Sequence, residues 1–154
     1  MGEKIIFMEP QLVSQVSASR ELLQQQFPAA EIIDHYQEQL KELFLIRHPP
    51  YRFNQNYQPV WEQFLAAHAG GQPLHYSGSW FYFPWSRQLV HYLPGELHQE
   101  LRTARNRNLI TAAEQDKFYN FTVGIAGLSV GSHSAATLAM MGGARQMKLA
   151  DADT

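Results

Sequence analysis

The chain has 154 residues, a formal net charge of −2 and 45% hydrophobic residues, which suffices for one ordinary domain or two small ones with a real core. With a pI near 6.4 and no Cys, it offers no basic surface for nucleic acid, no disulfide, no thioester cysteine and no paired-cysteine zinc site. No apolar run approaches the roughly 18 residues that span a bilayer, and the N-terminus lacks a secretory h-region, so we expect a cytoplasmic protein without membrane contact.

The first fifty residues predict one strand and two helices. A short strand is expected at 4–8, where Ile and Phe are β-prone, and a helix at 19–27, closed by Pro28. The clearest helix is expected at 31–46, because its apolar residues recur at three- and four-residue spacing. The seven His residues show no metal-ligand spacing, so no metal site is expected.

A further helix and a β-hairpin follow. Pro59 suits the first turn of a helix at 60–69, and the glycines after it suit its end. The aromatic run at 79–85 and the segment 88–93 read as the two strands of a hairpin. Pro84 indicates that the first of these strands lies at a sheet edge or carries a bulge. Residues 1–100 are therefore expected to form an α+β region, whose role the sequence leaves open.

Residues 101–121 are expected to form a connecting helical segment. A short charged helix is predicted at 96–102, running toward Arg107. Thr111 and Glu114 stand three residues apart and form the pattern of a capping box, in which each side chain bonds the other residue's free N–H. A helix at 112–119 should follow and lead directly into a strand.

Residues 122–154 have the order of a mononucleotide-binding β-α-β unit. An apolar strand at 123–126 precedes a Gly- and Ser-rich turn at 127–132, a small-residue helix at 135–141 and a Gly-Gly stop. A second strand at 147–150 then ends in Asp151. Two parallel strands and one helix cannot bury both faces of a sheet, so we expect a piece of a longer Rossmann-like domain.

The turn favours an anionic ligand, although its glycine pattern is incomplete. Gly127 permits a tight reversal, and the N–H groups and dipole of the following helix attract phosphate. Ser129 and Ser132 stand where the pattern G-x-G-x-x-G asks for glycine, and Gly131 is out of register. Asp151 is placed to accept hydrogen bonds from ribose hydroxyls. The alternative is a plain packing unit that binds no ligand.

The segment AGLSVGSHSAATLAMMGGARQMKLADADT resembles the nucleotide-binding segment of the ThiF/MoeB and ubiquitin-activating-enzyme superfamily. Its two closing acids, Asp151 and Asp153, are more telling than its glycines, because NAD-binding Rossmann domains usually carry one acid there. Upstream, the run from Arg105 to Ile110 is similar to the family's Tyr-Ser-Arg-Gln-Ile segment, with a somewhat shorter gap to the glycine turn. The resemblance covers about residues 102–154.

The resemblance implies a nucleotide site and an activity. The glycine turn would hold the phosphates of ATP, the first acid of the pair would bind the ribose, and the upstream Arg would reach a phosphate, often across a homodimer interface. The positions that match are Gly127, Ser129, Gly131, Ser132, Asp151, Asp153 and Arg107. The full-length protein would then use ATP and Mg²⁺ to activate a carboxylate of a protein, peptide or other substrate as an acyl-adenylate.

The family's later Arg, Lys and magnesium-binding Asp would lie beyond residue 154, so the resemblance implies a fragment that is inactive alone. The fold class expected is α/β, an α+β region at 1–100 followed by the truncated start of a Rossmann-like domain. The alternative function is a non-catalytic binding module, whose turn is structural or binds NAD or FAD.

Overall fold

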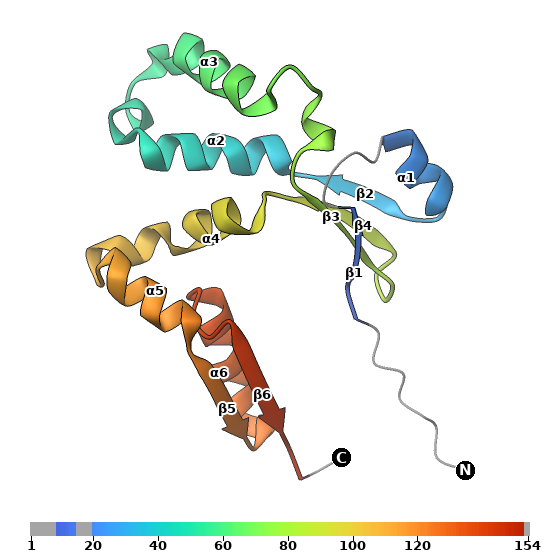
Figure 1. Ribbon diagram of the computed structural model, residues 1–154, viewed down its shortest axis with the longest axis vertical. Coiled ribbons are helices and arrows are strands. Elements are labelled where there is room, and N and C mark those ends of the chain that lie inside the picture. The colour runs from blue at the N-terminus through green and yellow to red at the C-terminus, as the bar shows by residue number, and fades with distance from the viewer. Residues whose placement is uncertain (1–8, 15–19, 153–154) are drawn as a thin grey trace. The chain divides into compact units, whose positions relative to one another are not determined.

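The computed structural model describes residues 9–14 and 20–152, and it has a mixed α/β fold (Figure 1). The described residues form six α-helices and two sheets. The chain divides into two compact units, Met1–His98 and Gln99–Thr154. The strand predicted at 4–8 lies outside the described residues.

A four-stranded mixed sheet forms the centre of the first unit. Its strands are β1 (Gln11–Ser14), β2 (Glu31–Asp34), β3 (Ser79–Phe83) and β4 (Gln88–Tyr92), in the order β1-β3-β4-β2. β3 runs antiparallel to β1 and β4, which confirms the hairpin, and β2 runs parallel to β4.

The edge-strand prediction for β3 is wrong, because β3 is an interior strand paired on both sides. Pro84 follows the last residue of β3 and lies in the turn, where a missing N–H breaks no ladder. The irregularity in the pairing with β1 falls between Leu12 and Ser14 of β1 itself.

The long helix predicted at 31–46 is divided. Glu31–Asp34 is strand β2, and helix α2 covers Tyr36–Arg47. The β-branched Ile32 and Ile33 pair in parallel with β4, a tertiary contact that overrides the helical spacing. The change occurs at Asp34, whose Oδ1 accepts a hydrogen bond from the N–H of Tyr36 at 3.2 Å.

The other helices of the first unit match the sequence prediction. α1 covers Arg20–Gln26, and α3 covers Gln58–Ala69 with Pro59 in its first turn and Gly70 after its end at φ 57°. Short 3₁₀ turns connect these elements: η1 (Pro49–Arg52), η2 (Gln55–Tyr57) and η3 (Leu74–Tyr76).

Two apolar clusters stabilise the first unit. Leu23 of α1 packs on Trp80 and Leu89 of the sheet, and all three are buried. Phe44 of α2 is fully buried and contacts Trp61 and Phe64 of α3. Burial of each such side chain stabilises the folded state by about 1.5–3 kcal/mol relative to leaving it in water.

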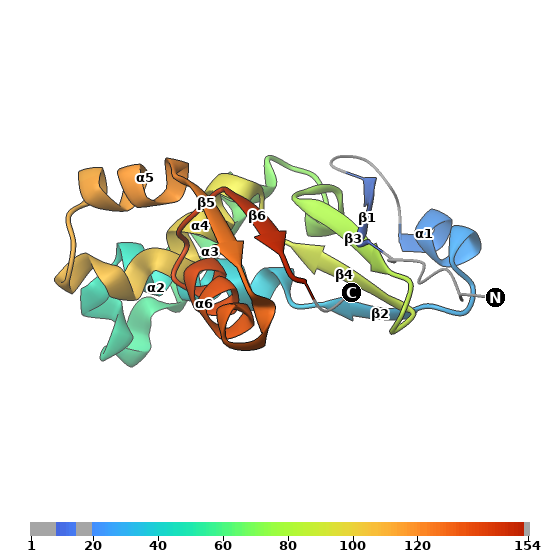
Figure 2. The ribbon, with the colours of Figure 1, turned by 90° about the horizontal axis from the view of Figure 1, so that it is seen from below.

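The helix α4 (Gly95–Thr103) leads into the second unit. The unit continues with η4 (Ala104–Asn108), α5 (Ala112–Asn120), β5 (Thr122–Ala126), α6 (Leu128–Met140) and β6 (Gln146–Ala150). The capping box of Thr111 and Glu114 is present, as predicted. β5 and β6 pair in parallel, and α6 lies along one face of the pair (Figure 2).

The turn between α6 and β6 is held by the preceding helices. Gly142 ends α6 at φ 69°, so the predicted glycine stop is confirmed. The N–H of Ala144 donates to the carbonyl of Phe118 in α5 at 2.9 Å. A Cβ on Gly143 would lie 2.3 Å from the Phe118 ring. These contacts place β6 beside β5 in a fixed register.

Within the described part of the chain, every helix is too short or too polar to cross a bilayer.

Candidate functional site

A single glycine forms the turn between β5 and α6. Gly127 has φ 85° and ψ 100°, and α6 begins at the next residue, Leu128. The prediction that the turn reaches residue 132 and the helix starts at 135 is therefore wrong. Only Gly127 needs a left-handed backbone, and the residues after it are compatible with a helix. The Ser132 hydroxyl bonds back to the carbonyl of Ser129 at 3.1 Å, a local contact within the helix.

Gly131 lies inside the first turns of α6, on the side that faces β5. A Cβ at this position would lie 2.7 Å from Cγ2 of Ile125. Its small size therefore lets the helix approach the strand closely, which is the role of the third glycine in a dinucleotide-binding turn.

The carboxylate of Asp151 lies at the N-terminus of α6. The carboxyl ends of the parallel strands β5 and β6 meet at one edge, and the Gly127 N–H donates to the Ala150 carbonyl at 2.8 Å. Asp151 follows β6 directly, and its Oδ2 accepts a hydrogen bond from the N–H of Leu128. The structure thus brings together Gly127, the start of α6 and the predicted ribose-binding acid.

The start of α6 can receive one more anionic or polar group. The N–H groups in the first turn of a helix have no acceptor within the helix, and the dipole makes this end positive. Gly127 has no side chain to cap them, and Ser129 and Val130 are exposed. A phosphate beside these N–H groups and a hydroxyl donor beside Asp151 would suit the charges present.

Arg107 lies near the opposite end of α6. Its guanidinium pairs with Glu100 at 3.1 Å, and both belong to the second unit. The neighbouring Asn106 donates to the carbonyl of Met141, at the C-terminal end of α6. Because α6 has 13 residues, about 20 Å of helix separates that end from Leu128. One chain does not bring Arg107 to its own helix N-terminus. Asp153 lies outside the described residues.

A second polar group, in the first unit, escaped the sequence analysis. The His91 ring is fully buried and stacks between Trp80, at a centroid distance of 4.2 Å, and Tyr36, at 4.3 Å. Its Nδ1 lies 2.9 Å from Asp34 Oδ1, and its Nε2 lies 2.6 Å from the carbonyl of Ser77. Each ring nitrogen therefore lies within hydrogen-bond distance of an acceptor oxygen, one of a carboxylate and one of a backbone carbonyl.

This group shifts the titration of its neighbours. The hydrogen bond from His91 lowers the pKa of Asp34, with a smaller opposing contribution from burial. Burial raises the pKa of Tyr36 to about 12. The Tyr36 hydroxyl lies 2.8 Å from Nε2 of His68, and burial lowers the pKa of His68.

Only the parallel pairing of β2 with β4 makes Asp34 and His91 direct neighbours. The two residues are 57 positions apart, and no local pattern links them. Among the described residues, no three His, Asp or Glu side chains gather as a metal ion would need.

Comparison with known proteins identifies a partial relative. A segment of 74 residues is 43% identical to a Mycobacterium tuberculosis (strain CDC 1551 / Oshkosh) protein named only as the uncharacterized protein MT1398. The segment covers 48% of this chain and 10% of that protein, so the match spans about a tenth of the relative's length. No family model matches the sequence, and no solved structure matches the chain.

Proposed function

We propose that the second unit is the first β-α-β of a Rossmann-like nucleotide-binding domain. The protein to which it belongs would be a ThiF-like adenylyltransferase that uses ATP to activate a carboxylate. The relative at 43% identity is much longer than the matched segment, which is compatible with a domain of a larger protein.

One observation carries the proposal: the Asp151 carboxylate lies at the N-terminus of α6, where the first N–H groups of the helix have no acceptor within it. A nucleotide whose phosphate faces the N–H groups of Ser129 and Val130 would present its ribose to Asp151. The hydrogen bond from Leu128 holds the carboxylate in position, which reduces the ordering cost on binding. The resemblance of residues 102–154 to the ThiF/MoeB superfamily selects ATP over other nucleotides.

The catalytic contribution of this segment would be positioning and charge stabilisation. The helix N-terminus would hold the phosphate chain in line for attack by a substrate carboxylate on the α-phosphate, with pyrophosphate leaving. Arg107 would reach this site only from a second copy, since its own chain places it near the far end of α6.

The exposed apolar surface of the second unit supports a larger sheet. Val130, Met140 and Leu149 are 79%, 70% and 51% exposed. Parallel sheets are normally covered on both faces. Further strands and helices of a longer protein would cover this surface.

A non-catalytic module is the second candidate. Asp151 already satisfies the first N–H of α6 without any ligand, as a structural cap would. In this case the turn is structural, or it holds NAD or FAD without chemistry, and the first unit recognises a protein or peptide.

Calorimetry on the 154-residue chain tests ligand choice. ATP should bind, NAD and FAD should bind more weakly, and Asp151→Ala should abolish the ATP signal. Asp116→Ala, which removes an exposed acid on α5 of the same unit, is the matched control and should leave binding unchanged. ATP binding that survives Asp151→Ala would remove Asp151 from the site. Pyrophosphate exchange by the longer protein separates the enzyme from the module, which would show none.

A further inference from the structure

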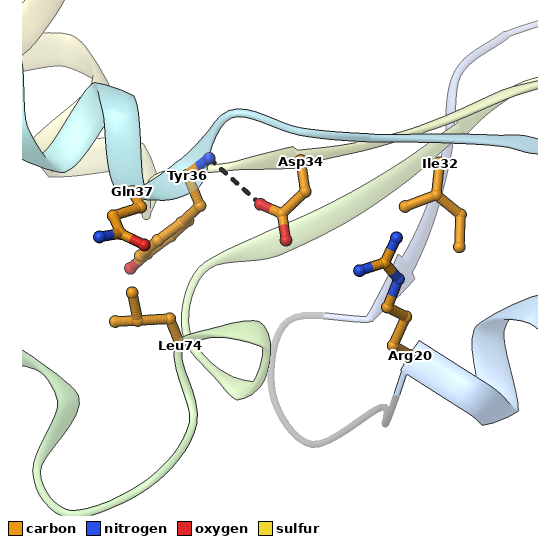
Figure 3. Close-up of a pocket in the computed structure, with 6 residues that line it drawn as sticks. All are labelled: Arg20, Ile32, Asp34, Tyr36, Gln37 and Leu74. Carbon is orange, nitrogen blue, oxygen red and sulfur yellow. Dashed lines mark hydrogen bonds between the residues drawn. The ribbon is translucent and has the colours of Figure 1, made fainter.

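The first unit contains a polar cavity that the nucleotide proposal does not use. It measures about 390 Å³, within the range of small-molecule sites. It opens between the end of β2, the start of α2, the start of α1 and η3 (Figure 3). Six of the described residues line it: Arg20, Ile32, Asp34, Tyr36, Gln37 and Leu74.

Asp34 presents one carboxylate oxygen to this cavity. Its Oδ1 accepts from the N–H of Tyr36 and from His91, whereas its Oδ2 makes no hydrogen bond to any described residue. The side chain is 35% exposed, so Oδ2 is accessible to a ligand. The hydrogen bonds to Tyr36 and the buried His91 hold the carboxylate in one orientation, as a rigid acceptor requires.

Arg20 supplies the opposite charge. Its guanidinium lines the same cavity, on the other side of Asp34 from Gln37 (Figure 3). The structure has no ion pair between Arg20 and Asp34, both of which are described, and no hydrogen bond from Arg20 to another described residue. The two charged groups thus face one cavity without a direct contact, and, beside the hydrogen bond from His91, the charge of Arg20 contributes to the lowered pKa of Asp34.

The remaining lining gives the cavity a polar end and an apolar side. The Gln37 amide can donate and accept hydrogen bonds, and Ile32 and Leu74 present aliphatic surface. Arg20 gives the cavity a positive group and Asp34 a negative one, so the lining suits a ligand that carries both a carboxylate and an ammonium group.

We propose that this cavity binds a small zwitterion, a free α-amino acid with an aliphatic side chain. Arg20 binds its carboxylate, Oδ2 of Asp34 accepts from its ammonium group, and its side chain lies against Ile32 and Leu74. Planar guanidinium recognises carboxylate in a bidentate manner, which sets the direction of the ligand. The proposal involves the first unit alone and is independent of nucleotide binding.

The test is an NMR titration of the ¹⁵N-labelled full chain with L-leucine. Saturable shifts are expected at the amides of Gln37 and Leu74, with a Kd on the order of 1 mM. Two matched probes dissect the ligand: isoamylamine lacks the carboxylate and 4-methylpentanoate lacks the ammonium group. Each should bind at least about tenfold more weakly than leucine, because one charged contact is lost.

Variants locate the binding. Arg20→Gln should weaken leucine binding at least about tenfold, and Arg52→Gln, an exposed Arg of the same unit, should leave it unchanged. Asp34→Asn keeps the Oδ1 acceptor for Tyr36 and should remove the preference of leucine over 4-methylpentanoate; spectral dispersion reports whether the variant is folded. The proposal is overturned by equal binding of 4-methylpentanoate, by unchanged binding to Arg20→Gln, or by absence of shifts up to about twenty times that Kd.

Discussion

Gly131 of α6 and Ile125 of β5 are in such close contact that a Cβ on the glycine would lie 2.7 Å from Cγ2 of the isoleucine. This contact sets how deeply α6 sits on β5. The N–H of Leu128 donates a hydrogen bond to Asp151, which follows β6. The contact of Gly131 with Ile125 therefore also positions the N-terminus of α6 relative to this carboxylate.

Gly131→Ala should destabilise the second unit by about 1–3 kcal/mol, because the added methyl overpacks against Ile125. Urea unfolding measures the change. Gly124→Ala is the control: nothing lies within 4 Å of its Cβ position, and its effect should stay within about 0.5 kcal/mol. Equal effects of the two substitutions would argue against close helix–strand packing at Gly131.

Gly78→Ala should cost about 3 kcal/mol or more. The residue has φ 76°, and a Cβ would lie 2.3 Å from the carbonyl oxygen of Tyr92 and 2.4 Å from Cε2 of Tyr36. Gly71→Ala separates backbone strain from the clash, because Gly71 has φ 82° and nothing within 4 Å, so it should cost only about 1–2 kcal/mol. Thermal unfolding compares the two variants. Similar losses of stability in the two variants would show that the Tyr36 ring moves away from the added methyl group at no cost in free energy.

Local signals in the sequence predicted many of the elements. The capping box of Thr111 and Glu114, Pro59 at a helix start and the aromatic hairpin each depend on residues a few positions apart. The helix prediction for residues 31–34 was wrong because their apolar spacing suits a helix, and only pairing with β4 makes them a strand. No local pattern reports such a contact.

The two candidate sites also differ in whether local sequence signals could predict them. Asp151 and Gly127 belong to one continuous motif, so the sequence predicted them as a pair. The helix start was misplaced because Ser129 and Ser132 suggested an extended turn, whereas both residues adopt helical geometry after one glycine. Asp34, His91 and Arg20 come from three separate elements. The pairing of β2 with β4 brings the first two together, and Arg20 of α1 lines the same cavity as Asp34.

Acid should unfold the first unit partly through Asp34. Hydrogen bonding to His91 lowers the pKa of this carboxyl below its usual 3.8 in the folded protein. The folded state therefore binds fewer protons than the unfolded state, and this contribution to stability is present above pH 3.8 and lost as the pH falls through the folded pKa. Asp34→Asn should flatten the pH dependence of the unfolding free energy below this value. An unchanged slope would contradict the lowering of the Asp34 pKa by its hydrogen bond to His91.

Alkali should destabilise the first unit through ionisation of Tyr36. Burial raises its pKa from 10.0 to about 12, so the folded state retains a proton that the unfolded state releases. This contribution is fully present below pH 10.0 and is lost as the pH rises toward 12. Tyr36→Phe should remove that part of the alkaline loss, measured as the difference in urea unfolding free energy from the unsubstituted chain. A difference that stays constant with pH would contradict the buried hydroxyl.

The most direct measurement of the central claim is an ATP titration of the ¹⁵N-labelled chain, read residue by residue. If the start of α6 and Asp151 form the nucleotide site, the amides of Leu128, Ser129 and Val130 shift together and saturate, and Asp151→Ala abolishes the response. Shifts confined to other parts of the chain, or a response at these amides that Asp151→Ala leaves unchanged, would contradict the account.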